Sequence, residues 1–108
     1  MGTRDWKFLL RGGHSGGNIT ADVTTAAINV YDLKSLAVKG SVGTAGTSIA
    51  FKVLDENDAE RGTLITLSSS GAFHSDWFTE FSGKVKIKME NVGNWAFDEN
   101  VYLLGERV

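Results

Sequence analysis

Residues 83–92 read Gly-Lys-Val-Lys-Ile-Lys-Met-Glu-Asn-Val, and this stretch decides the fold class of the chain. Charged and apolar side chains alternate along it: Lys84, Val85, Lys86, Ile87, Lys88, Met89 and Glu90. Because successive side chains on a strand point to opposite faces, a strand here has one charged face and one apolar face. A half-buried strand of this kind is typical of an antiparallel sheet.

Short runs of the same kind recur on both sides of this stretch, separated by turns rich in Gly, Asn, Asp and Ser. The predicted strands are 6–11, 25–33, 36–42, 47–54, 63–67, 84–92 and 101–104. Turn signals about every 8–12 residues are the signature of an all-β sandwich or barrel. The sequence therefore predicts one all-β domain over residues 1–108, a two-sheet antiparallel β-sandwich of jelly-roll or other Greek-key type.

The sequence does not decide the local structure of two segments. Residues 19–33 carry apolar side chains at helical spacing, but they are rich in β-branched residues, which favour a strand from about Thr25 to Leu33. Residues 72–81 fit either a strand or one helical turn capped by Ser75, with Asp76 at its start. Residues 95–97, Trp-Ala-Phe, are expected to pack inward.

Composition excludes several classes of function. The 108 residues include no cysteine, so the chain has no disulfide, thiol nucleophile or cysteine-ligated metal. The net charge is −2 and no basic block occurs, so we expect neither nucleic acid nor a membrane surface as partner. The N-terminus lacks a signal-peptide pattern, and no apolar run approaches the roughly 18 residues of a membrane span.

One short motif resembles a catalytic site. Residues 13–17, Gly-His-Ser-Gly-Gly, match G-x-S-x-G, the pattern of a nucleophile elbow. That elbow requires a helix after the serine and a large α/β domain, and this chain offers neither. We therefore interpret the segment as a glycine loop and predict no enzymatic activity, no catalytic residue and no cofactor.

Oxygen donors gather in the loop 55–62, where calcium binding stays an open alternative. Asp55, Asn57, Asp58 and Glu60 are ligand types that Ca²⁺ accepts, but their spacing fails the EF-hand pattern. Asp and Asn are also ordinary turn residues, so a solvated hairpin tip is the favoured interpretation. His14 and His74 are too few for a metal signature, and we predict no metal site.

Aromatic side chains are the candidates for binding a partner. Most of them are needed to fill the core of a small sandwich, but exposed Trp or Tyr side chains can stack on a sugar or anchor a protein. Trp77 and Trp95 lie next to turns and are the best candidates for an exposed platform. Whether these aromatics form core or platform stays open at this level.

Residues 1–24 form an apolar stretch followed by glycines, which suits an N-terminal arm. Trp6, Phe8 and Leu10 share one face of a strand and are predicted to bind a partner. We expect Trp6–Leu10 to add as a strand to a neighbouring subunit or partner. The alternative is that the segment pairs within its own chain.

The row Lys84, Lys86 and Lys88 has two interpretations. It is either a surface for an acidic partner or a solvated sheet face whose charges oppose aggregation. The negative net charge favours the solvated face.

Three segments resemble a known class of domain: residues 47–53 (Thr-Ser-Ile-Ala-Phe-Lys-Val), 70–73 (Ser-Gly-Ala-Phe) and 81–88 (Phe-Ser-Gly-Lys-Val-Lys-Ile-Lys). Over residues 36–92 their short strands and Gly/Ser/Thr-rich turns look like the small jelly-roll and sandwich domains of bacteriophage virion proteins. Capsid decoration (cement) proteins and fibre-associated modules belong to that class. The same pattern is similar to carbohydrate-binding modules.

The first resemblance implies a non-enzymatic virion structural protein, made in the host cytoplasm, that decorates or cements a phage capsid. Its partners would be the major capsid protein or another virion protein, and it would form a homo-oligomer, most often a trimer. The second resemblance implies a carbohydrate-binding module or a receptor-binding tip domain, with a glycan as ligand.

Overall fold

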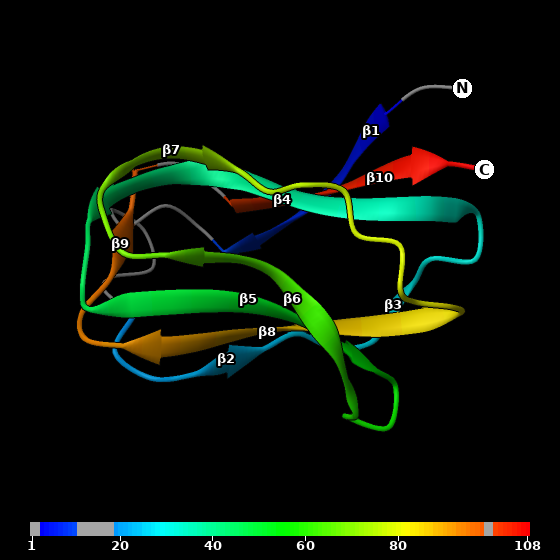
Figure 1. Ribbon diagram of the computed structural model, residues 1–108, viewed down its shortest axis with the longest axis horizontal. Helices are drawn as coiled ribbons and strands as arrows, with labels where there is room; N and C mark the ends of the chain where they lie inside the picture. The colour runs from blue at the N-terminus through cyan, green and yellow to red at the C-terminus, as the bar shows by residue number, and fades with distance from the viewer. Residues whose placement is uncertain (1–2, 11–18, 99–100) are drawn as a thin grey trace.

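The computed structural model describes the backbone of residues 3–10 and, with their side chains, residues 19–98 and 101–108. The ten strands of these residues form two antiparallel sheets that pack face to face (Figure 1). The first sheet has the order β1 (Thr3–Leu10), β10 (Val101–Arg107), β4 (Leu33–Thr44), β7 (Gly71–His74), and β9 (Ala96–Phe97) also pairs with β4. The second has the order β2 (Val23–Thr24), β8 (Lys84–Val92), β5 (Ser48–Asp55), β6 (Glu60–Leu67), and β3 (Ile28–Asn29) also pairs with β8. The predicted β-sandwich is confirmed, and the described residues contain no helix with the length and apolarity that a membrane crossing requires.

Strand β8 has the two faces that its alternation predicts. Val85, Ile87 and Met89 are buried, whereas the intervening side chains face outward and are exposed or half-buried. β5 pairs with β8 from Ser48 to Asp55, and it buries Ile49, Phe51 and Val53 on the same side. The two strands therefore form the centre of one wall of the core.

Large side chains from both sheets fill the space between them. The largest fully buried ones are Trp95, Phe51, Phe97, Leu36, Ile49, Ile87, Met89 and Leu103. The Phe51 ring lies 5.8 Å from that of Phe73 and 6.3 Å from that of Phe97, with Phe73 and Phe97 edge to face at 6.1 Å. The prediction that residues 95–97 pack inward is confirmed for Trp95 and Phe97.

The strand predicted from Thr25 to Leu33 is wrong in its extent. Within residues 19–33, only the short strands β2 and β3 pair with β8, and the ladder is interrupted between them. There the Ile87 N–H donates to the Thr25 hydroxyl at 3.0 Å, so a side chain occupies the place of a strand carbonyl. The chain then turns at Tyr31 and Asp32 before β4 begins.

Of the two alternatives left open for residues 72–81, the strand holds as far as His74, where β7 ends, and no helical turn begins at Ser75. Instead, residues 75–83 cross from the first sheet to the second as an irregular segment (Figure 1). The Ser75 hydroxyl accepts the Val38 N–H at 2.9 Å, and the Ser75 N–H donates to the Val38 carbonyl at 2.9 Å. Ser75 therefore continues the pairing along β4 beyond the end of β7, instead of capping a helix.

Strand β1 pairs antiparallel with β10 of the same chain, from Thr3–Glu106 to Leu10–Val101. The segment thus pairs within its own chain, which is the alternative to an intermolecular arm that the sequence left open. The side chains of the predicted partner-binding residues Trp6, Phe8 and Leu10 lie outside the described residues, as does the glycine loop with its G-x-S-x-G motif.

Deletion of residues 1–11 is expected to lower the melting temperature of the isolated chain by about 10 °C, because β10 loses a ladder partner. Differential scanning calorimetry at several protein concentrations measures this. A truncated chain that melts as the full chain does, but has lost a larger assembly in light scattering, would show that the strand serves a neighbour instead.

Candidate functional site

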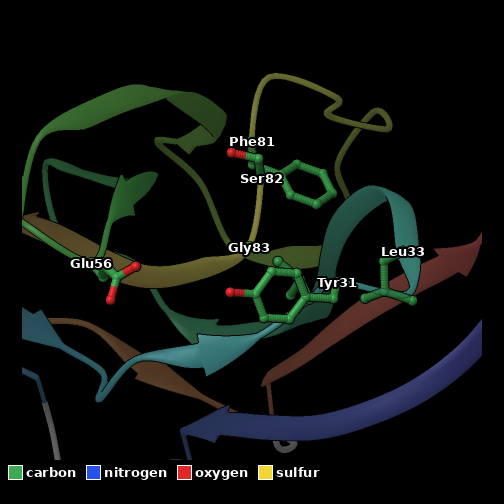
Figure 2. A pocket seen from close by; sticks show the side chains of 7 residues that line it. Tyr31, Leu33, Glu56, Phe81, Ser82 and Gly83 are labelled. Carbon is green, nitrogen blue, oxygen red and sulfur yellow. The ribbon is translucent and has the colours of Figure 1, made fainter.

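A cleft of about 500 Å³ lies at one end of the sandwich. Three segments meet there: the turn between β3 and β4, the β5–β6 hairpin and the residues just before β8 (Figure 2). The lining residues are Val30, Tyr31, Leu33, Glu56, Phe81, Ser82 and Gly83. Its volume falls in the range of small-molecule sites, and its lining combines apolar side chains with polar groups.

Tyr31 stands at the tip of a hydrogen-bonded turn. The Leu33 N–H donates to the Val30 carbonyl at 3.1 Å, and the Tyr31 N–H donates to the Asn29 side-chain oxygen at 3.0 Å. These bonds fix the backbone on both sides of the tyrosine, because an Asn side chain that accepts from the residue two positions later mimics a turn. Tyr31 is nevertheless 69% exposed, the second most exposed large apolar side chain in the described residues.

The Tyr31 ring lies against Gly83. A Cβ placed on Gly83 would be 3.4 Å from Tyr31 Cε1, and Gly83 has φ +71°, a conformation that glycine adopts without strain. The Val30 N–H donates to the Gly83 carbonyl at 2.8 Å, which ties the two walls of the cleft together. The ring thus lies beside the Gly83 backbone, and hydrogen bonds fix the backbone of the turn that carries the tyrosine.

Phe81 forms another wall of the cleft, and it packs against a side chain that is anchored on the sandwich. Its ring stacks on that of Phe78 at 6.4 Å and 17°. Phe78 is fixed by two backbone hydrogen bonds with Leu36, at 2.7 and 2.9 Å, and its ring covers Gly62, where a Cβ would approach it to 2.6 Å. The wall therefore rests on β4 and β6, not on a free loop.

The carboxylates of the β5–β6 hairpin have different roles. Asp55 accepts the N–H groups of Asn57 and Ala59 at 2.8 and 3.0 Å, which closes the turn. Asp58 pairs with Lys86 at 2.8 Å, and Glu60 pairs with Lys52 at 3.3 Å. Glu56 has no hydrogen-bond or ion-pair partner among the described residues, and it lines the cleft.

The calcium alternative for this hairpin has little geometric basis. Three of its oxygen donors are engaged in closing the turn or in ion pairs, as described above. Within the part of the chain that the structure describes, no three His, Cys, Asp or Glu side chains gather as a metal site would require.

The structure separates the two tryptophans that the sequence grouped together. Trp95 is fully buried and its Nε1 donates to the Val92 carbonyl at 3.1 Å, so its prediction as an exposed platform is wrong. Trp77 is 39% exposed and meets the His74 ring edge to face at 6.0 Å, but it does not line the cleft.

The lysine row lies on the outward face of the second sheet, where Lys86 pairs with Asp58 and Lys88 pairs with Glu90. Lys52 and Lys88 stand directly opposite each other, and Glu90 bridges them at 3.0 and 3.2 Å. The hydrogen bond to Glu90, followed by that to Glu60, raises the pKa of Lys52, and the Lys52 bond lowers the pKa of Glu90. Like charges opposite each other would otherwise be unfavourable, so the network fits a solvated sheet face better than a surface for an acidic partner.

The sequence did not predict Tyr31, Glu56 or Phe81 as site residues. The predicted strand 25–33 contains Tyr31, and Phe81 is one of the aromatics that the sequence leaves open between core and platform. The available signal was local: Asn29 and Asp32 flank Tyr31, and both are turn-forming residues. Tyr31 and Phe81 each lie 25 positions from Glu56, and no pattern in the sequence predicts that the three side chains meet.

Comparison with known proteins supports the fold. No protein-family model matches the chain, and no curated protein matches its sequence significantly. The solved structure of TmCBM61 in complex with β-1,4-galactotriose is similar, with a TM-score of 0.52 and 21% identity over 82% of this chain and 69% of that chain. FlgD from Xanthomonas campestris, described in relation to hook capping in flagellar assembly, gives a TM-score of 0.44 and 16% identity over 84% of this chain and 71% of its own. The chain thus resembles a β-sandwich carbohydrate-binding module in fold, and neither structure is a phage capsid protein.

Proposed function

We propose that this chain is a non-enzymatic glycan-binding domain whose Tyr31 cleft holds a sugar ring. The observation that carries the proposal is the exposed tyrosine, held by a rigid turn and a glycine at the edge of a cleft of suitable size. An aromatic side chain that stays exposed although its backbone is fixed is expected where it meets a ligand.

The chemistry of the cleft matches the two kinds of surface on a sugar. A pyranose ring presents an apolar C–H face, which packs on an aromatic ring, and an edge of hydroxyl groups, which need hydrogen-bond partners. Tyr31 and Phe81 supply aromatic surface, while Ser82 and Glu56 supply polar groups at the same cleft (Figure 2). In Figure 2 the Tyr31 hydroxyl points to the side of the cleft on which Glu56 lies.

The fold is compatible with this function. The similar sandwich TmCBM61 was solved with β-1,4-galactotriose bound. At 21% identity that likeness concerns the fold alone, so the assignment of the site depends on the cleft.

Tyr31→Ala is expected to weaken glycan binding by about tenfold or more, because stacking contributes about 0.5–1.5 kcal/mol beyond the apolar area that the ring buries. Binding is measured by calorimetric titration with neutral gluco-, galacto-, manno- and xylo-oligosaccharides. Trp77→Ala is the matched control: it removes an exposed aromatic outside the cleft and should leave affinity unchanged. Loss of binding in the Trp77 variant alone would move the site to Trp77, and no binding to any glycan would refute the proposal.

A second candidate is a homo-oligomeric virion protein that decorates a capsid through protein contacts. The observation that favours it is the position of β1 at the edge of the first sheet, with β10 as its one partner strand in the described residues. A free sheet edge can accept a further strand from another chain. Light scattering on the purified protein tests this: a trimer supports the assembly, whereas a monomer at high concentration argues against it.

A further inference from the structure

The charge of the cleft comes from Glu56. Of the seven residues that line the cleft, Glu56 is the charged one, and no cation is among them. Lys84 follows Gly83 directly, but it belongs to the exposed outward face of β8 and does not line the cleft. A ligand in the cleft therefore meets a negative charge that no lining group offsets.

Glu56 differs from the other acidic residues of the same hairpin in its hydrogen bonds and ion pairs. Asp55, Asp58 and Glu60 each accept hydrogen bonds or pair with a lysine. Glu56 does neither among the described residues, so its oxygens are free to accept hydrogen bonds from a ligand. A carboxylate in this position accepts from hydroxyl or ammonium groups and repels another carboxylate.

We propose that Glu56 is a specificity-determining residue, through which the cleft selects neutral sugars and rejects acidic ones such as uronic acids. This inference rests on the proposed glycan-binding function. A uronic acid differs from the corresponding hexose by a carboxylate in place of the C6 hydroxymethyl group. In the cleft that carboxylate loses part of its hydration and finds Glu56 instead of a cation, so the acidic sugar is bound more weakly.

The test compares sugars that differ only in this group. The probes are methyl β-galactoside against methyl β-galacturonide, and methyl β-glucoside against methyl β-glucuronide, titrated into the full chain and followed by ¹H–¹⁵N NMR. We expect each neutral sugar to bind about fivefold tighter than its acidic counterpart at low salt. Added salt should narrow this ratio, because screening weakens interactions between partly exposed charges.

Glu56→Gln keeps the shape of the side chain and removes its charge, so the ratio of the two dissociation constants should fall towards one. Glu80→Gln is the matched control, because Glu80 is an exposed acid of the crossing segment that does not line the cleft. It changes the net charge equally and should leave the ratio unchanged.

The possible outcomes separate the two proposals. Equal binding of neutral and acidic sugars, or a ratio unaffected by Glu56→Gln, overturns the specificity inference and leaves glycan binding intact. If Glu80→Gln changes the ratio of dissociation constants as much as Glu56→Gln does, the specificity inference is also overturned, because the effect then comes from the net charge of the protein. Binding of neither kind of sugar, in these titrations and with the oligosaccharides above, overturns both proposals.

Discussion

Ile87→Ala is expected to lower the free energy of unfolding by about 2–5 kcal/mol. Ile87 is fully buried in the middle of β8, where it faces the other sheet, and the removed atoms leave a cavity in a close-packed core. A domain of this size has a total stability of about 5–15 kcal/mol, so the loss is a large share of it. Urea titration followed by tryptophan fluorescence measures the change.

Lys86→Ala is the control on the adjacent, outward-facing position. Lys86 pairs with Asp58 at 2.8 Å, but surface ion pairs contribute about 0–1 kcal/mol, so this substitution should be nearly silent. Equal destabilisation by the two substitutions would mean that the faces of β8, and with them the register of the sheet, are assigned wrongly.

Trp95→Ala is expected to cost about 3–5 kcal/mol of stability, the upper range for loss of a buried aromatic. The Trp95 side chain is fully enclosed, packs closely over Gly46 and uses its Nε1 to satisfy the Val92 carbonyl. Its removal leaves a large cavity, although the Val92 carbonyl still accepts the Thr47 N–H at 2.9 Å. Thermal unfolding followed by far-UV circular dichroism measures the effect without relying on tryptophan fluorescence.

Trp77→Ala provides the comparison, because the same side chain is removed at a position that is 39% exposed. We expect its effect on the melting temperature to be a small fraction of that of Trp95→Ala. If instead Trp95→Ala left stability unchanged and only weakened ligand binding, the original interpretation of Trp95 as a platform would be restored.

The sequence by itself determined the strands whose faces differ in polarity. The alternation in residues 84–92 and 48–55 is a local property of the chain, and the period of two in a strand converts it directly into a buried face and a wet face. Two such central strands, with frequent turns between short runs, suffice to predict a two-sheet sandwich. The inward packing of Phe97 follows from the same reasoning.

Only the tertiary structure decided which aromatics are exposed and where a ligand can bind. Trp77 and Trp95 both lie beside turns, and their different burial depends on what the other sheet and Gly46 place around them. The cleft joins Tyr31, Glu56 and Phe81, which are about equally far apart in the chain and share no local pattern. Burial and proximity between distant segments are set by sheet packing and by single hydrogen bonds, such as that of Thr25, which no periodicity in the sequence encodes.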